Sequence, residues 1–242
     1  MCAAANRVWD SAMMDFSWLP KYLPLLTDGL WLTIQLLVFS VIFGFILAVP
    51  IGLVQVTGPR PLAWAARAFC TTIRGTPLLI QLWLLYYGLG SLFPQIPWIR
   101  QSFMWPVLRE GYFYAIVAFT LSFAGYEGEV MRGAFQSVPK GELEAGRAFG
   151  MSRFTLLRRI WLPRAVRQVL PTLAGEVVLQ LKSTPIAFTV TVMDLYGVAY
   201  KVRQDTYLVY PPLIIVTIAY VALSAIIVLA FRYVEKQVPI KR

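Results

Sequence analysis

The sequence contains no histidine and only two cysteines, Cys2 and Cys70, among its 242 residues. Without histidine, a histidine-ligated metal site and a histidine general base are excluded, and we expect no metal site. Two cysteines are too few for a disulfide framework. The pattern G-x-x-x-x-G-K-[ST], which cradles nucleotide phosphates, is also absent. We therefore expect a chain that is not an enzyme and does not itself hydrolyse a nucleotide.

Charge is also scarce, because charged residues form 14% of the chain and hydrophobic residues form 58%. Soluble domains carry about 25% charged residues, so the composition indicates an integral membrane protein, which we expect to be all-α. The first 16 residues contain no uninterrupted apolar core, which argues against a cleavable signal peptide. The net charge of +10 could suit nucleic acid, but the sequence shows no interleaved aromatic and basic pattern that reads bases. We expect no nucleic-acid partner.

Five segments are predicted to cross a bilayer, since a spanning helix needs about 20 mostly apolar residues. They cover about residues 29–56, 75–92, 111–127, 169–193 and 206–231. The fourth contains Glu176 and Lys182, which makes it a poor lipid-facing helix. We expect it to contact other helices or a polar cavity. Pro185 cannot donate a backbone hydrogen bond, so this fourth span should be broken or kinked there.

The distribution of lysine and arginine predicts the orientation of these spans. One side of the five-span topology receives fifteen of them and the other side receives six. Basic residues favour the cytoplasm, so the N-terminus is predicted outside, and the loop 137–163 and the tail 232–242 inside. Residues 1–28 are rich in aromatic side chains and are predicted to lie at the outer membrane interface. A disordered tail is the alternative for this segment.

The stretch EAGRAFGMSRFTLLRRIWLP, residues 144–163, concentrates arginines inside an otherwise apolar chain. Pro139 suits the start of a first short helix, Gly150 its end, and Ser152 the cap of a second helix. Pro163 is predicted to mark a turn toward the broken span. From these residues alone, the pair of helices could rest on anionic lipid or dock on a partner protein.

The apolar positions of the second short helix are predicted to share one face. Phe154, Leu157 and Trp161 lie on this face, and we expect them to pack back on the membrane domain.

The spacing of Glu144-Ala145, Gly150 and Ile160-x-Leu162-Pro163 resembles the EAA loop of ABC importer permeases. Gly146 departs from the pattern, because the family usually has alanine there, and it can weaken the helix by up to ~1 kcal/mol. The resemblance implies that residues 144–150 form a coupling helix in a cleft of a cytoplasmic ATPase. The coupling residues it implies are Glu144, Ala145, Gly146, Arg147 and Gly150.

Further matches narrow the family. The run RGTPL from Arg74 to Leu78 resembles the signature of polar amino-acid permeases, and residues 126–139 fit the segment before their EAA loop. The likeness runs from about residue 29 to residue 231 and implies the type I ABC importer permease fold. The chain is similar to permeases for histidine, lysine and arginine, and to those for octopine and nopaline. Residues 102–110 are similar to the opine group in particular.

This resemblance implies a transmembrane subunit of an ATP-driven, binding-protein-dependent importer in the bacterial inner membrane. Its cargo would be a cationic amino acid or an arginine-derived opine. The implied partners are a second, similar permease chain, two ATPase subunits that hold ATP and Mg²⁺, and a periplasmic binding protein. No cofactor is expected in this chain. An ion-coupled secondary transporter or channel is an alternative, although the inverted repeat typical of such transporters is not found. A scaffold that only anchors the ATPase is another alternative.

The resemblance also implies substrate-binding residues. Glu176 matches the glutamate thought to hold the substrate cation in basic amino-acid permeases, and an intramembrane carboxylate suggests a functional site. A structural pair with Lys182 is the competing interpretation, although six residues place the two side chains about 240° apart around a helix. Thr184 and Gln81 could add hydrogen bonds. Asp194 could help the cation to enter or simply cap a loop. Whether the two permeases are identical stays open.

Overall fold

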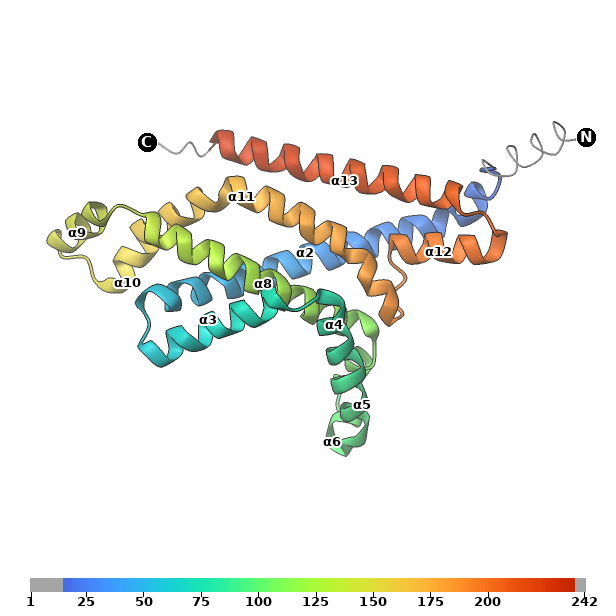
Figure 1. The fold of residues 1–242 in the computed structure, drawn as a ribbon, viewed down its shortest axis with the longest axis horizontal. Helices are drawn as coiled ribbons and strands as arrows, with labels where there is room; N and C mark the ends of the chain where they lie inside the picture. The colour runs from blue at the N-terminus through green and yellow to red at the C-terminus, as the bar shows by residue number, and fades with distance from the viewer. Residues whose placement is uncertain (1–14, 238–242) are drawn as a thin grey trace, which may run out of the picture.

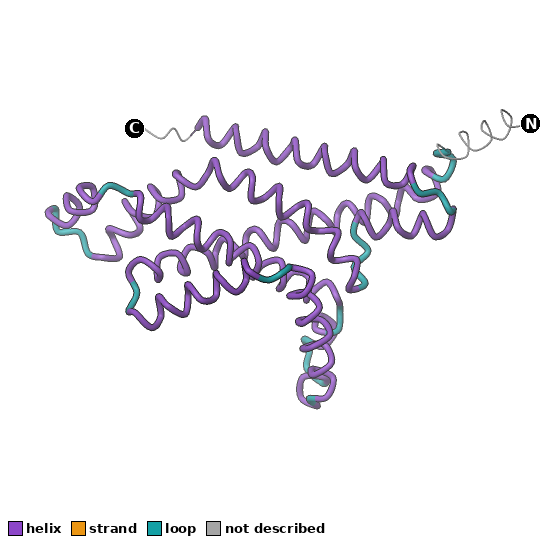
Figure 2. Tube along the Cα trace, in the orientation of Figure 1, coloured by secondary structure: helices purple, strands orange, loops and turns teal. Residues whose placement is uncertain are grey.

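The computed structural model describes residues 15–237, and within them every regular element is helical. Figures 1 and 2 show long helices joined by short loops, with little irregular chain between them. In chain order, the elements are α2 (Leu19–Thr57), α3 (Arg60–Gly75), α4 (Leu78–Trp83), the π-helix η1 (Leu84–Leu89), α5 (Gly90–Leu92), the 3₁₀ helix η2 (Phe93–Gln95), α6 (Pro97–Arg100), α7 (Trp105–Leu108), α8 (Gly111–Ser137), α9 (Lys140–Ala148), α10 (Arg153–Leu156), the π-helix η3 (Leu157–Trp161), α11 (Leu162–Ser183), the 3₁₀ helix η4 (Thr184–Val190), α12 (Leu195–Thr206) and α13 (Tyr210–Gln237).

The body of the molecule is an elongated bundle of α2, α3, α8, α11 and α13 (Figure 1). Glycines allow α2 and α8 to approach closely. A Cβ atom on Gly52 would lie 2.7 Å from the Cβ of Met131 and 2.8 Å from the backbone nitrogen of Arg132. A Cβ atom on Gly44 would lie 2.9 Å from the Cβ of Phe123. Small residues at helix contacts are typical of membrane bundles, where tight packing takes the place of a hydrophobic driving force between helices.

Among the described residues, α2 and α13 are long and apolar enough to cross a membrane. The bent pair formed by α3 and residues 78–95 would be a third span if it is counted as one. α8 and α11 have 27 and 22 residues, which is also enough to cross, but they carry charged residues. Both helices contact neighbours inside the bundle. Their charges therefore do not need to face lipid.

The first helix begins ten residues earlier than the sequence predicted. α2 starts at Leu19, so residues 19–28 continue the helix and do not form a separate segment. Trp18 and Tyr22 are buried in a cluster with residues of α12, and the Tyr22 hydroxyl donates to Asp205 at 2.9 Å. This packing extends the helix beyond the hydrophobic stretch. Residues 1–14 of the predicted N-terminal segment lie outside the described residues.

The prediction for the second span, residues 75–92, is wrong in its geometry. Residues 60–74, expected as a loop between the first two spans, lie in α3, which packs along α2 and α8. The chain then bends by 106°, and residues 78–95 leave the bundle as an arm (Figure 1). Arg74 therefore lies in the last turn of the packed helix α3 and not in a loop between two spans. Without Arg74, the excess of basic residues on the predicted cytoplasmic side persists.

The predicted break in the fourth span is confirmed. The α-helix ends at Ser183 and continues as the 3₁₀ helix η4, whose second residue is Pro185. The predicted turn at Pro163 is wrong, because the chain continues without a break from η3 into α11. Pro163 lies in the first turn of α11, and the wider π-helical turn of η3 precedes it. The fourth span thus begins near Leu162, seven residues before the predicted start.

The last helix contains most of the predicted fifth span. α13 begins at Tyr210, has Pro211 and Pro212 in its first turn, and extends to Gln237. The predicted tail 232–242 is therefore helical up to residue 237, and residues 238–242 lie outside the described part. Figure 1 places the end of α2, the α9–α10 loop and the end of α13 toward one end of the bundle, and α12 toward the other. This relative placement fits the predicted topology.

Candidate functional site

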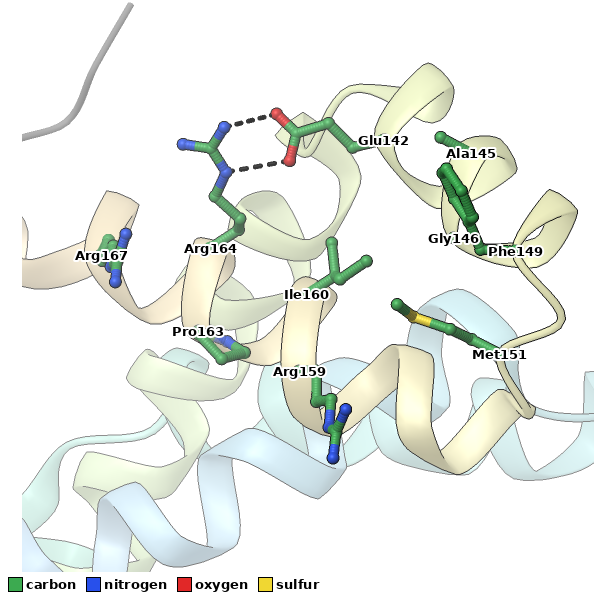
Figure 3. Close-up of a pocket in the computed structure, with 10 residues that line it drawn as sticks. All are labelled: Glu142, Ala145, Gly146, Phe149, Met151, Arg159, Ile160, Pro163, Arg164 and Arg167. Carbon is green, nitrogen blue, oxygen red and sulfur yellow. Dashed lines mark hydrogen bonds and ion pairs between the residues drawn. The ribbon is translucent and has the colours of Figure 1, made fainter.

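The first candidate site is the short helix α9 at one end of the bundle. Pro139 is its N-cap residue, and Glu142 lies in its first turn. The Glu142 carboxylate accepts two hydrogen bonds from Arg164 of α11, at 2.6 and 2.9 Å (Figure 3). This two-point contact fixes the orientation of α9 relative to α11.

The residues that end α9 behave as the sequence predicted. Gly150 has φ +75°, the left-handed conformation that glycine adopts without a Cβ penalty. The backbone nitrogen of Met151 then donates to the carbonyl of Gly146 at 3.1 Å. The Ser152 hydroxyl accepts from the backbone nitrogen of Thr155 at 3.2 Å and caps α10. Local capping chemistry therefore shapes this loop.

The predicted coupling residues divide between two faces of α9. Glu144, Ala145 and Arg147 are exposed, as is Gly150 beyond the helix. Gly146 is buried, and a Cβ atom there would lie 2.5 Å from Leu156 Cδ1 and 3.0 Å from Ile160 Cδ1. Gly146 therefore faces its own chain and lets α9 pack closely.

Phe149 is an exposed residue that the sequence interpretation did not single out. It follows α9 directly, and 83% of its surface is exposed. It lines a cleft of about 450 Å³ together with Met151 and Ile160, and Figure 3 shows it at the end of α9. The sequence position just before Gly150 could have indicated this exposure. A large apolar residue at the end of a helix does not belong to the buried face of that helix.

The apolar face of the second short helix differs from the prediction. Phe154 is 70% exposed, so the expectation that it packs back on the membrane domain is wrong. Leu156 is buried instead. Trp161 does pack back: its indole nitrogen donates to the Phe135 carbonyl at 2.9 Å, and the two rings meet edge to face. The π-helical turn from Leu157 to Trp161 shifts which side chains face inward.

The second candidate site lies in the middle of the bundle. Glu176 of α11 is half-buried, and Arg74 acts on it electrostatically. No ion pair within 4.0 Å joins Glu176 to a cation in the described part of the chain. The pair with Lys182, the competing interpretation of Glu176, is therefore not formed, and Lys182 is exposed.

Glu127 of α8 is a further carboxylate at this level, and the sequence interpretation missed it. It is fully buried, and Glu176 is its electrostatic neighbour. Its place at the end of the predicted third span, residues 111–127, could have been a signal. A charged residue at the boundary of a span is normally solvated. The sequence alone therefore did not distinguish Glu127 from a charged residue of the following loop.

Two of the predicted substrate residues are joined through a third side chain. The Thr184 hydroxyl lies 2.9 Å from the Tyr220 hydroxyl, and that hydroxyl donates to Asp194 at 3.5 Å. Thr184 and Asp194 are fully buried within the chain. Asp194 also caps α12, accepting from the backbone nitrogen of Gly197 at 2.9 Å. The geometry thus matches the cap that the sequence analysis offered as one alternative for Asp194.

Gln81 does not join these residues in the structure. Its amide nitrogen donates to the Ile73 carbonyl at 2.8 Å and to the carbonyl and hydroxyl of Thr76 at 3.0 and 2.8 Å. These contacts cross the sharp bend between α3 and α4 and hold its geometry. The buried amide oxygen of Gln81 has no hydrogen-bond partner within residues 15–237.

Comparisons with known proteins agree with this arrangement. Residues 40–239 match the family described as "Binding-protein-dependent transport system inner membrane component". The chain therefore belongs to this family, and it is a membrane-embedded permease subunit of an ABC importer, in which the ATPase is a separate subunit. Membership of this family argues against the two alternative functions, an ion-coupled transporter and a scaffold that only anchors the ATPase.

Individual relatives are transporters of amino acids and opines. The octopine transport system permease protein OccM of Rhizobium meliloti is 45% identical over 182 residues, which cover 75% of this chain and 73% of the relative. The nopaline permease NocM of Agrobacterium fabrum is 38% identical over 194 residues, covering 80% and 79%. The histidine/lysine/arginine/ornithine permease HisM of Escherichia coli is 36% identical over 209 residues, covering 86% and 87%.

Solved structures support the fold. A crystal structure of an amino acid ABC transporter with histidines has a TM-score of 0.78 and 28% identity, and the match covers 93% of this chain and 99% of that one. The MetNI methionine ABC transporter in an inward-facing conformation has a TM-score of 0.74 and 20% identity, with 90% and 98% covered. The type I ABC importer permease fold expected from the sequence is confirmed.

Proposed function

We propose that this permease translocates a cationic amino acid or an arginine-derived opine across the bacterial inner membrane. The named relatives belong to transport systems for octopine, for nopaline, or for histidine, lysine, arginine and ornithine. Each of these molecules has a nitrogen group that is positively charged or can be protonated. The observation in this chain that carries the proposal is Glu176. It places a half-buried carboxylate on a broken helix inside the bundle, where a charge is unfavourable without a functional partner.

In the proposed mechanism, α9 is the coupling helix. Its exposed face enters a cleft of an ATPase subunit, which holds ATP and Mg²⁺. Closure of two ATPases then moves α9, and the Glu142–Arg164 contact transmits that motion to α11, which carries Glu176. Such a transmission of motion needs a rigid connection between α9 and α11, and the bidentate ion pair between Glu142 and Arg164 supplies one.

The proposed assembly contains a second permease, similar to this chain, and a periplasmic binding protein that delivers the substrate. The N-terminus lies outside and the C-terminus inside, as the distribution of basic residues indicates. The exposed apolar surfaces of α13 and of the arm, among them Ile218, Leu229 and Trp98, suit lipid and the second permease.

The experiment is ATP-driven uptake by the assembled transporter in proteoliposomes. Glu176→Gln removes the charge and little volume, so assembly and basal ATP hydrolysis should persist while uptake of labelled arginine falls at least tenfold. Glu110→Gln is the control, because Glu110 is exposed and, among residues 15–237, forms an ion pair only with its neighbour Arg109. Normal uptake by the Glu176 variant, or failure to assemble, would contradict this role. Uptake by the wild type without ATP or binding protein would contradict the importer mechanism.

A further inference from the structure

A second cleft, which we call the arginine cleft, lies between the end of α2 and the segment from α9 to η3. Its volume is about 660 Å³, which is in the range of ligand-binding pockets. α2 contributes Leu53 and Thr57 to its lining, and the segment from α9 to η3 contributes Arg147, Arg153 and Trp161. Apolar walls and two cations therefore meet in one cavity.

The two arginines of this cleft have no carboxylate partner in the described part of the chain. Arg147 and Arg153 are exposed, and neither forms an ion pair within 4.0 Å among residues 15–237. None of the described residues that line the cleft is acidic. Arg164 of the neighbouring cleft, by contrast, is paired with Glu142. Because guanidinium groups suit phosphate and carboxylate oxygens, the arginine cleft is suited to an anion.

The α2 wall of the arginine cleft continues an exposed apolar face of that helix. α2 is long and apolar enough to cross a membrane, and Phe39, Ile46 and Pro50 are exposed on it. At about 100° per residue, these three residues and Thr57 lie within about 40° of one another around the helix axis. An exposed apolar face on a spanning helix is suited to acyl chains. The cleft is therefore open toward a surface on which lipid can lie.

The opposite wall and the position along α2 place the arginine cleft at a membrane boundary. Thr57 is the last residue of α2, so the cleft lies where this spanning helix ends. The Trp161 indole nitrogen donates to the Phe135 carbonyl at 2.9 Å, which fixes that ring in the wall. Tryptophan is enriched at the level of lipid headgroups. The buried side chain of Leu156 also lines the cleft.

We propose that the arginine cleft binds an anionic phospholipid, whose headgroup contacts Arg147 and Arg153 and whose acyl chain lies along the apolar face of α2. A soluble anion would make no use of the apolar wall, and an acidic protein segment would make no use of its continuity with α2. Basic pockets beside spanning helices suit anionic headgroups. The lipid would connect α2 to the loop that carries α9, and Arg147 would contact lipid and not the ATPase.

The test is native mass spectrometry of the purified, assembled transporter, titrated with phosphatidylglycerol or phosphatidylcholine of the same acyl chains. The wild type should prefer phosphatidylglycerol. One basic residue beside anionic lipid contributes roughly a fivefold preference, so Arg153→Gln should lower the preference about fivefold and the Arg147→Gln, Arg153→Gln double variant about 25-fold. Arg158→Gln is the matched control: it removes the same charge from the same segment, but Arg158 is exposed and lines neither cleft. It should keep the wild-type preference.

A second variant tests the cavity without changing its charge. Thr57→Trp places a large ring in the arginine cleft, so it should also weaken phosphatidylglycerol binding, and it decides the question if the double arginine variant does not assemble. Equal losses for Arg153→Gln and Arg158→Gln would show only a general attraction of lipid to a basic loop and would overturn the site. Unchanged lipid preference in Arg153→Gln and Thr57→Trp would overturn it too. If Arg153→Gln instead weakens ATPase binding at unchanged lipid preference, the cleft belongs to the ATPase contact.

Discussion

Replacing Phe149 with alanine should separate the docking of the ATPase from the folding of the permease. Phe149 is 83% exposed at the end of α9, and its removal leaves no cavity in the permease. Exposed substitutions of this kind change the free energy of unfolding by about 0.5 kcal/mol or less. The permease should therefore insert and fold normally.

The expected effect on docking follows from the exposed area. A phenylalanine buries about 150–250 Å² when it is fully covered. With 83% exposed here, a partner could cover about 120–210 Å² more. At about 25 cal/mol per Å², this corresponds to about 3–5 kcal/mol as an upper estimate. The ordering of side chains at an interface offsets part of it. We expect a loss of about 2–3 kcal/mol, or roughly a 30- to 150-fold weaker complex.

The assay is titration of the purified permease with the ATPase subunit, with a parallel thermal unfolding measurement. Phe103→Ala is the matched control: Phe103 is 92% exposed but lies on the arm beyond α6, far along the chain from α9. Its replacement should leave ATPase binding unchanged. Equal affinity of the wild type and the Phe149 variant would refute the docking role of this end of α9. A large fall in the melting temperature of the variant would refute the argument from exposure.

Two other predictions concern topology and the end of α9. In a background without native cysteines, a cysteine at Ser102 should react with an impermeant thiol reagent added to intact cells, and one at Lys140 should not; labelling at Lys140 would reverse the orientation. Gly150→Ala should destabilise the loop by about 1–2 kcal/mol, since φ is +75° there, whereas Gly150→Asn should be milder. Equal thermal unfolding of the two variants would show that the left-handed conformation is not required.

Local signals account for the parts of the fold that the sequence predicted well. The stop at Gly150, the cap at Ser152 and the helix break at Pro185 each depend on a backbone preference of one residue. Such preferences act over one helical turn, so they survive in any tertiary context that keeps the helix. The resemblance of residues 144–163 to the EAA loop indicated the family, and the family implied the fold.

The sequence interpretation failed where two helices must be placed relative to each other. Gly75, Thr76 and Pro77 do signal an interruption, but the 106° bend and the packing of α3 on α8 depend on close contacts far along the chain. A Cβ atom on Gly125 would lie 2.5 Å from Ile73 Cγ2, so this contact requires glycine on the partner helix. Composition treated residues 60–74 as a charged loop because it cannot register such a contact.

The sequence by itself determined that this chain is a helical membrane protein with a basic loop before its fourth span, because hydropathy, charge distribution and capping residues act locally; the resemblance of that loop to the EAA loop indicated a permease. It also identified Glu176 as a carboxylate inside a span. Only the tertiary structure decided that Gly146 faces inward, that Phe149 is exposed and that Glu127 is buried. Exposure is a property of the whole packed bundle. A glutamate in the interior of a helix such as α8 is solvated in one arrangement of the bundle and buried in another.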